Sequence, residues 1–478
     1  MNAEATVVRT LVYQIVVDRF AGSAGAAVEP VPAGAPQWSH HCGGTLDGIS
    51  ARLDHIASTG ADAIYLTPVF LAATNHKYDT ADFRQVDPRF GGDAAFERLA
   101  AACRSRGMGL ILDAVFNHVG RDHAWFRAAE ADPSAPERQY FRWKSPTDYD
   151  CWRGHKSLPE LNLSNEAVRQ ALVTGPDSVA RHWLRRGATG WRVDCANDVG
   201  PECCGLLSRV AREEGAPDGV TGELWNFADD WFACGALSGV MNYYFRETVL
   251  TLVRGDIAPA QAAYNFKRMA RAYPQAALLR SWNLLASHDT PRLVHEISDP
   301  ARRAFLWVLA FVFPGVPMVY YGEETGMDGS HDPDNRRPMN WDESAWDTGT
   351  LNLIRRLAAL RRQHAALSEG CYLPLPQPGV PALLAFARTR PWPGHTVFVM
   401  ANAGDQPLRA RAFVPYAWLH DAAPLRDLLG AAPPTRAASG SIPIELPPWG
   451  IALYQADDSS IPNYRFFKHQ TPDPCCPS

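Results

Sequence analysis

The sequence predicts a (β/α)8 barrel followed by a smaller β domain. Eight short apolar runs alternate with segments of helical spacing between about residue 10 and residue 365. The runs are apolar on both faces, which is typical of buried parallel strands. A chain of 478 residues is also longer than one ordinary domain, so a large barrel leaves room for a second unit. In a barrel of this kind the C-terminal strand ends open into the active site.

The eight expected strands are short, and each precedes a helical pattern or a long polar loop. Helical spacing is clear at residues 46–60, 94–107 and 177–187, each of which ends in glycine, a helix stop signal. The expected strands are residues 11–20, 63–70, 109–117, 190–194, 219–225, 237–243, 281–288 and 316–324.

Four segments follow from these patterns. The catalytic barrel is expected over residues 1–366, and residues 117–163 are too long, polar and aromatic for a simple crossover, so they predict an inserted subdomain after the third strand. Short alternating runs predict an antiparallel β-sandwich over residues 367–456. The tail at residues 457–478 has no periodicity and is expected to be loosely ordered.

Composition excludes several classes of partner. A net charge of −5 without a Lys/Arg run argues against nucleic acid. No apolar run is long enough to span a bilayer, and the N-terminus lacks the pattern of a signal peptide, so no membrane partner and a cytoplasmic location are expected. The ten cysteines form no CxxC pair and are expected to be free thiols.

Three carboxylates just past expected strands predict the chemistry. Asp194, Glu223 and Asp289 follow three different apolar runs, and a barrel brings strand ends to one rim. Two converging carboxyl groups can cleave a glycosidic bond. Asp194 and Glu223 end the fourth and fifth strands, and neighbouring strands lie about 4.8 Å apart, so the sequence predicts a retaining glycosidase.

Several motifs, in order, resemble the α-amylase superfamily, glycoside hydrolase family 13. They are DAVFNH (113–118), GWRVDCAND (190–198), GELW (222–225) and LLASHD (284–289), with further matches at 64–92 and 315–326. The segments LPELN (158–162), SHDTPR (287–292) and DPDNRRPMNW (332–341) are most similar to those of neopullulanases, cyclomaltodextrinases and maltogenic amylases.

The resemblance implies a role for each site residue. Asp194 is expected to be the nucleophile, Glu223 the general acid/base, and Asp289 the third acid that grips sugar hydroxyls. Arg192 lies two residues before Asp194, on the same strand face, and is expected to keep the nucleophile ionised. The remaining expected substrate-binding residues are Tyr78, Asp113, His118, Asn197, Trp225, His288, Asp332 and Arg336.

The expected activity is hydrolysis of α-1,4 bonds in maltooligosaccharides with some transglycosylation; cyclodextrins and pullulan are further candidate substrates. The open alternatives are an α-1,6-glucosidase, a sucrose-type glucosidase or transglycosidase, and a catalytically inactive binding protein. No cofactor is expected. Calcium remains open in principle, but residues 21–36 after the first strand carry almost no oxygen-bearing side chains, and Ca²⁺ needs about 6–8 oxygens. The oligomeric state is left open.

Overall fold

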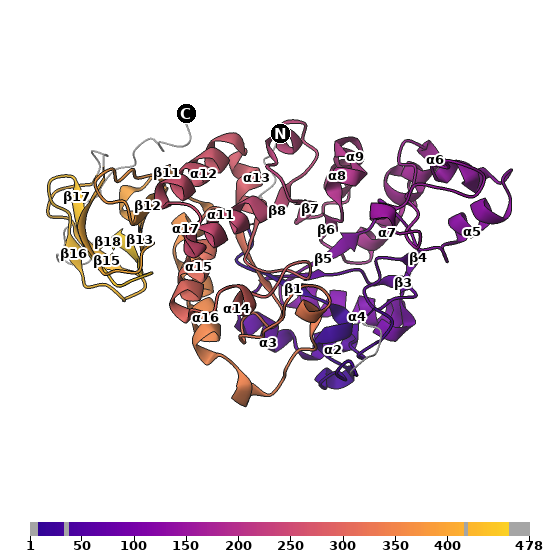
Figure 1. The fold of residues 1–478 in the computed structure, drawn as a ribbon, viewed down its shortest axis with the longest axis horizontal. Helices are drawn as coiled ribbons and strands as arrows, with labels where there is room; N and C mark the ends of the chain where they lie inside the picture. The colour runs from indigo at the N-terminus through magenta and orange to yellow at the C-terminus, as the bar shows by residue number, and fades with distance from the viewer. Residues whose placement is uncertain (1–7, 33–37, 415–418, 458–478) are drawn as a thin grey trace. The chain divides into compact units, whose positions relative to one another are not determined.

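The computed structural model describes residues 8–32, 38–414 and 419–457. Eight strands close into a barrel in the order β1-β10-β9-β8-β7-β6-β5-β2, of which β1, β5, β6, β7 and β8 are labelled in Figure 1. The paired registers between β10, β1, β2, β5, β6 and β7 are parallel. The barrel predicted from the sequence is therefore confirmed. The strands are β1 Val12–Ile15, β2 Ala63–Leu66, β5 Gly109–Ala114, β6 Gly190–Val193, β7 Gly219–Leu224, β8 Gly239–Asn242, β9 Trp282–Leu284 and β10 Val316–Tyr320.

The barrel strands are shorter than the apolar runs that contain them. The expectation of one strand over residues 11–20 is wrong, because β1 ends at Ile15 and Val17–Phe20 forms a helical turn, α1. Residues 63–70 also split: β2 ends at Leu66, and Phe70–Ala72 becomes β3, which pairs with β4, Thr80–Val86, as an antiparallel hairpin. Each barrel strand uses only part of its apolar run. The remaining apolar residues of the run are buried in the segments that follow the strand at the rim of the barrel.

Helices follow most of the barrel strands along the chain. The expected helix over residues 46–60 is broken at Arg52, whose guanidinium bonds the Gly25 carbonyl at 2.5 and 2.9 Å. The helices are α2 Leu46–Ala51, α3 Leu53–Ser58, α4 Gly92–Ser105, α5 Ala124–Ala131, α6 Glu166–Arg169, α7 Val179–Arg185, α8 Ala196–Val199, α9 Pro201–Glu213, α10 Asp229–Ala233, α11 Tyr243–Arg254, α12 Pro259–Ala272, α13 Gln275–Arg280, α14 Leu293–Glu296, α15 Pro300–Val312, α16 Thr348–Gln363 and α17 Ala365–Glu369.

The insertion after β5 contains helix α5 and loops joined by isolated bridges rather than a sheet. Its core is aromatic: Phe126 meets Phe141 and Tyr149 edge-on, with ring centroids 5.1 and 4.8 Å apart. Edge-to-face aromatic pairs add packing energy to a segment with little regular backbone bonding. A bridge between His118 and Glu160 closes the insertion beside the barrel rim.

The C-terminal region is antiparallel, as predicted. A six-stranded sheet, in the order β11-β12-β13-β18-β15-β16, and the pair β14-β17 share one apolar core. The predicted tail lies outside the described residues beyond Asp457. The strands are β11 Cys371–Pro374, β12 Leu383–Thr389, β13 Val397–Asn402, β14 Leu408–Phe413, β15 Pro424–Asp427, β16 Thr435–Arg436, β17 Ser441–Leu446 and β18 Ile451–Ala456.

Packing divides the chain into two compact units. The first contains residues 1–241, 286–295 and 318–348, and the second contains residues 242–285, 296–317 and 349–478. Every expected site residue belongs to the first unit.

Among the described residues, no helix is both long and apolar enough to cross a membrane.

Candidate active site

Arg192 is the centre of a buried cluster of acids. It lies on β6 with no exposed surface, and the parallel register places it beside Asp113 of β5. Its Nη1 donates to Asp113 Oδ1 at 2.9 Å and to Asp194 Oδ1 at 2.9 Å. Its Nη2 lies 3.0 Å from Glu223 Oε2. One guanidinium thus holds three carboxylates, from three neighbouring strands, at one end of the barrel.

Asp194 and Glu223 lie close enough to act on one bond. The β6–β7 register pairs Val193 with Gly222, so the next residues, Asp194 and Glu223, lie side by side. A carboxylate oxygen of Asp194 and one of Glu223 lie within 4.8 Å of each other, and the two residues are only 5% and 8% exposed. Retaining glycosidases hold their two carboxyl groups about 5 Å apart, and inverting enzymes hold them at about 6.5–9.5 Å. The geometry therefore fits a retaining pair.

Burial controls protonation in this cluster. It raises the pKa of Asp194 well above its usual value; Arg192 opposes this rise and Glu223 adds to it. Burial also raises the pKa of Asp113 to about 6 against the pull of Arg192. Three buried carboxylates face one guanidinium, so full ionisation would leave two negative charges uncompensated, and the cluster as a unit favours holding a proton. A retaining nucleophile must itself be ionised, and at Asp194 the 2.9 Å contact with Arg192 acts in that direction against burial.

Two donors orient the Glu223 carboxyl group. The backbone N–H of Cys195 donates to Oε2 at 2.8 Å, and the indole N–H of Trp225 donates to Oε1 at 3.0 Å. Cys195 reaches this position with a φ of 46°, a conformation uncommon for residues other than glycine. Trp225 is 51% exposed, so its ring can also face a bound molecule.

Asp289 and Arg336 form a second charged group. Arg336 Nη2 donates to Asp289 Oδ1 at 3.1 Å, and Arg336 Nε donates to the His288 carbonyl at 2.9 Å. Asp332 lies 3.2 Å from Arg336 Nε and is half-exposed. The structure therefore brings Asp289 and Arg336 together, with Asp332 at their solvent side.

Tyr78 and His288 are stacked beside the acids. Their rings are 5.9 Å apart and inclined by 3°, Tyr78 Oη lies 2.5 Å from His288 Nε2, and it donates to Asp113 Oδ2 at 3.2 Å. The side-chain amide of Gln14 lies 2.6 Å from His288 Nδ1. Burial lowers the pKa of His288 well below its usual value, with Arg336 acting in the same direction, so the ring is neutral and both nitrogens are held.

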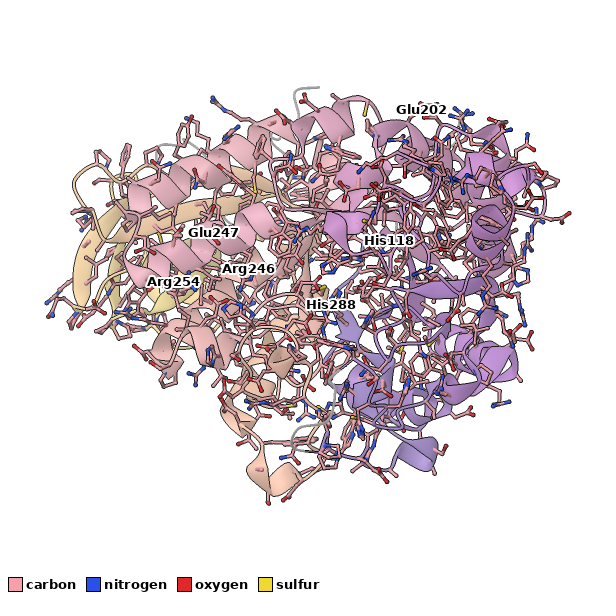
Figure 2. All side chains as sticks on the ribbon, turned by 45° about the vertical axis from the view of Figure 1, so that its right-hand side comes forward. His118, Glu202, Arg246, Glu247, Arg254 and His288 are labelled. Carbon is pink, nitrogen blue, oxygen red and sulfur yellow. The ribbon has the colours of Figure 1, made fainter. Side chains whose placement is uncertain are left out.

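His118 and Asn197 lie at different depths. His118, marked with His288 in Figure 2, is buried, its Nε2 has no hydrogen-bond partner in the described part of the chain, and burial lowers its pKa to about 4. A neutral, unpaired nitrogen of this kind can serve a ligand. Asn197 is exposed and donates to Asn226 Oδ1 at 3.3 Å, so it lies on the rim rather than in the acid cluster.

Four residues that position the site were missed by sequence reasoning. Gln14 holds His288, Tyr65 donates to Asp113 Oδ2 at 2.6 Å, and the Cys195 N–H holds Glu223. Asn335 donates to the carbonyls of His288 and Thr290, both at 2.8 Å. A glutamine inside the apolar run VYQIV was a readable signal, because a buried polar group needs a partner. The other three contacts depend on tertiary structure.

One group of metal-capable side chains occurs in residues 8–32, 38–414 and 419–457. It consists of Asp194, Cys195 and Glu223, whose ligand atoms lie within 4.8 Å of one another. Its two carboxylates and one sulfur do not fit Ca²⁺, which takes about 6–8 oxygen ligands.

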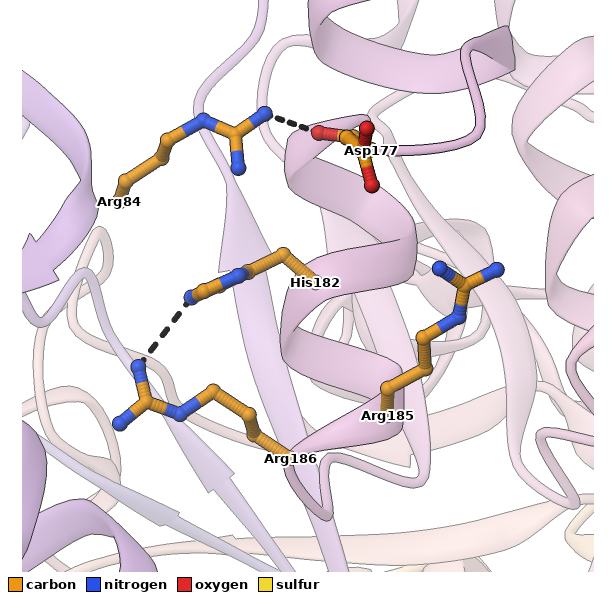
Figure 3. A pocket seen from close by; sticks show the side chains of 5 residues that line it. All are labelled: Arg84, Asp177, His182, Arg185 and Arg186. Atoms are coloured by element: carbon orange, nitrogen blue, oxygen red, sulfur yellow. Dashed lines mark hydrogen bonds between the residues drawn. The ribbon is translucent and has the colours of Figure 1, made fainter.

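A separate cavity of about 280 Å³ lies on α7 and β4, lined by Arg84, Asp177, His182, Arg185 and Arg186 (Figure 3). Its cations are largely neutralised by acids: Arg186 contacts Asp93 at 2.7 Å and Glu97 at 2.6 Å. It contains none of the acids of the barrel cluster, and we place no chemistry there.

Comparison of the sequence with known proteins identifies relatives of this chain. Residues 14–350 match the alpha amylase catalytic domain. The chain is 35% identical to a cyclomaltodextrinase from a Bacillus species, over 75% of this chain and 67% of the relative. It is 33% identical to neopullulanase 2 of Thermoactinomyces vulgaris, over 83% and 70%.

A solved structure extends the match over almost the whole chain. The debranching enzyme of Nostoc punctiforme is 30% identical, with a TM-score of 0.82, and the match covers 93% of this chain and 98% of that one. The family model, these identities and the paired carboxyls on a closed barrel lead to one conclusion: the chain belongs to the α-amylase family of glycosidases.

Proposed function

We propose that this protein is a retaining hydrolase of α-1,4-glucosidic bonds in maltooligosaccharides, with cyclodextrins and pullulan as further substrates and some transglycosylation. The observation that carries the proposal is the approach of Asp194 and Glu223 to within 4.8 Å around one buried arginine. The names of the two curated relatives, a cyclomaltodextrinase and a neopullulanase, support this substrate class.

In the proposed mechanism, Asp194 attacks the anomeric carbon while Glu223 protonates the leaving glycosidic oxygen. The resulting glycosyl-enzyme is opened by water, from which Glu223, now ionised, removes a proton. Arg192 stabilises the charge on Asp194 before attack and after release, through the 2.9 Å contact to Oδ1. The Trp225 and Cys195 donors fix the Glu223 carboxyl group so that its proton reaches the leaving oxygen.

The remaining residues are proposed to hold the sugar. Asp289, kept in place by Arg336, would accept hydrogen bonds from sugar hydroxyls as the ring distorts. Neutral His118 would donate to another hydroxyl through its unpaired Nε2. His288 would reach a hydroxyl where the sugar replaces Tyr78 Oη at its Nε2, and Tyr78 would stack against an apolar sugar face. Asp332 would meet the neighbouring donor-side sugar, and Asn197 and half-exposed Trp225 would meet the acceptor side.

An α-1,6 specificity is the second candidate. It is favoured by the likeness to a debranching enzyme over almost the full chain, because the same pair of acids can cleave either linkage and rim loops select between them. A sucrose-type specificity has no comparable support among these relatives. A catalytically inactive binding protein is disfavoured, since all three acids are present and clustered with their partners.

We further propose that the reaction needs no metal and that the protein acts in the cytoplasm. Arg192 already supplies the positive charge that a metal could offer to these carboxylates. Cys103 and Cys203 are free, buried thiols, which suits a reducing compartment. Purified protein dialysed against chelator should keep its turnover, and a fall that calcium restores would contradict the first part.

The test is product analysis with maltotriose, β-cyclodextrin, pullulan, isomaltose and sucrose in parallel. Glucose and maltose from maltotriose and β-cyclodextrin are expected, and products that retain the α-1,6 bond are expected from pullulan, with the α anomer released first in the NMR spectrum. Asp194→Asn should lower turnover by several orders of magnitude, whereas Asp54→Asn, at a carboxylate that is 92% exposed, should not. Turnover of isomaltose alone would favour the second candidate, and release of the β anomer first would refute the retaining mechanism.

A further inference from the structure

Lys77 is a fully buried cation that directly precedes Tyr78 in the chain. Neither its side chain nor that of Asp87 has any exposed surface. Its Nζ donates to Asp87 Oδ2 and, at 3.2 Å, to the Ala72 carbonyl, and it lies 5.1 Å from the centre of the Phe90 ring. A lysine is almost never fully buried unless it is paired, so the contact with Asp87 fixes where this side chain lies.

The backbone of Lys77 adopts a conformation that is costly for a lysine. Its φ is 66°, in the left-handed region that residues other than glycine seldom adopt, and such a residue persists only where its surroundings enforce it. The Lys77 N–H donates to Thr74 Oγ1 and the Lys77 carbonyl accepts from Thr80 Oγ1, both at a long 3.3 Å. The buried ion pair is therefore the strongest of the contacts that hold this turn.

Asp87, the partner of Lys77, is itself held by the backbone. The Asp87 N–H donates to the Val69 carbonyl at 3.0 Å, and the Asp87 carbonyl accepts from the Phe90 N–H at 2.9 Å. Its Oδ1 accepts from the Arg89 N–H at 2.8 Å. The ion pair thus ties residues 73–79, which join β3 to β4, to a fixed point just after β4.

The next side chain, that of Tyr78, belongs to the site. Its ring stacks on His288 with the centroids 5.9 Å apart, and its Oη donates to Asp113 Oδ2 at 3.2 Å. Its N–H donates to His76 Nδ1 at 3.1 Å. Because the backbone turns at Lys77, a change in φ there would move the Tyr78 ring relative to Asp113 and His288.

We propose that Lys77 is a positioning residue for the reaction: its buried pair with Asp87 fixes the turn that places the Tyr78 ring in the site. This inference rests on the proposed function, in which Tyr78 stacks against the sugar. Lys77 acts on the substrate only through Tyr78, so its replacement should lower kcat/KM where Tyr78 is present and not where Tyr78 is removed.

The test variant combines Lys77→Met with Asp87→Asn. Lys77→Met alone would leave a buried carboxylate unpaired, which is strongly destabilising, whereas the double variant removes both charges. Methionine, like lysine, is not branched at Cβ, so the cost of the positive φ is unchanged. Asparagine keeps the oxygen that accepts from the Arg89 N–H.

The matched control combines Arg9→Met with Asp218→Asn. Arg9 donates to Asp218 Oδ1 and Oδ2 at 2.7 and 2.9 Å, and the two side chains are 13% and 4% exposed. Asp218 directly precedes β7, and Arg9 also donates to the carbonyl of Asp62, which directly precedes β2. This pair therefore lies at the N-terminal ends of the strands, and the acids of the site lie at the C-terminal ends.

The first readout is kcat/KM for maltotriose, measured with and without Tyr78→Ala at a temperature where circular dichroism shows every variant folded. With Tyr78 present, the test variant should lose between about tenfold and about a hundredfold, as expected when a reacting geometry is misplaced. In the Tyr78→Ala background it should lose less than about twofold more, and the control pair should lose less than about twofold in either background. An equal loss in both backgrounds, or no loss with Tyr78 present, would overturn the proposal.

The second readout is amide hydrogen exchange of residues 73–79, followed by mass spectrometry, which needs no substrate. Exchange there should be faster in the test variant than in the wild type and the control pair, and unchanged exchange would count against the anchoring role. Faster exchange together with a wild type that is inactive on every substrate would support the anchoring role and refute the proposed function, so the two failures are distinguishable.

Discussion

Replacement of Arg192 by methionine tests how the acid cluster is held. The guanidinium is fully buried and contacts Asp113, Asp194 and Glu223 at 2.9–3.0 Å. Methionine has a similar length but no charge, so Arg192→Met leaves three buried carboxylates without their shared partner. Removal of one member of a buried ion pair typically costs about 3–5 kcal/mol, a large part of a total stability of about 5–15 kcal/mol.

The loss should depend on pH. In the wild type, burial raises the pKa of Asp113 to about 6, above the value of about 3.9 in an unfolded chain. The folded state therefore binds the proton more tightly, and this group's contribution to stability falls as pH rises from about 4 to about 6. Without Arg192 the main opposition to the effect of burial is lost and only the Tyr65 hydroxyl still lowers the pKa of Asp113, so the cluster keeps protons to higher pH. Arg192→Met should be less destabilised relative to wild type at pH 5 than at pH 8.

The assay is urea unfolding followed by circular dichroism at the two pH values. Arg98→Met is the matched control: Arg98 makes a bidentate contact with Asp47 but is 58% exposed, so water screens the pair and this variant should lose far less stability than Arg192→Met. Loss of the charge pair with the nucleophile, about 4 kcal/mol at an effective dielectric constant of 20, should also lower kcat/KM about 10³-fold. The reasoning fails if Arg192→Met unfolds like Arg98→Met at pH 8, or if its loss is greater at pH 5.

Three smaller changes test the positioning contacts. Gln14→Met removes the partner of His288 Nδ1 and should lower kcat/KM about tenfold, measured on maltotriose; an unchanged value would contradict a positioning role. Trp225→Phe keeps the ring but removes the donor to Glu223, so turnover of maltotriose should fall more than that of an aryl glycoside with an acidic leaving group, and equal losses would argue against this reasoning. Tyr65→Phe removes the hydroxyl that bonds Asp113 and should lower the free energy of unfolding by about 1–3 kcal/mol; a neutral effect in urea unfolding would show that the contact is weak.

Much of the barrel could be predicted because its strands are buried on both faces. All six residues of β5 and of β7 are buried, and such strands read as continuous apolar runs. Their ends could not be read in the same way. Leu285 and Ala286 are as buried as β9 itself but lie outside the strand. Apolar residues pack equally well in the loops at the rim, so burial does not mark the end of a strand; only the backbone hydrogen bonds do.

The contacts of the acids could be predicted only in part. Arg192 and Asp194 are two residues apart on one strand, so period-2 geometry puts them on one face. The approach of Asp113 to Arg192, and of Cys195 to Glu223, depends on the β5–β6 and β6–β7 registers. A local pattern does not encode the register between strands whose contacting residues are 79 or 28 positions apart in the chain.

The sequence by itself determined the fold class and the family and pointed to Asp194, Glu223 and Asp289 as the candidate catalytic acids, since apolar periodicity and short ordered motifs are local properties of the chain. Only the tertiary structure decided that one guanidinium serves three carboxylates, that Gln14 and Tyr65 hold His288 and Asp113, and that a thiol lies against both Asp194 and Glu223. The physical reason is distance: hydrogen bonds and charge pairs act over a few ångströms, and closure of the barrel alone brings residues from β1, β2, β5, β6 and β7 that close.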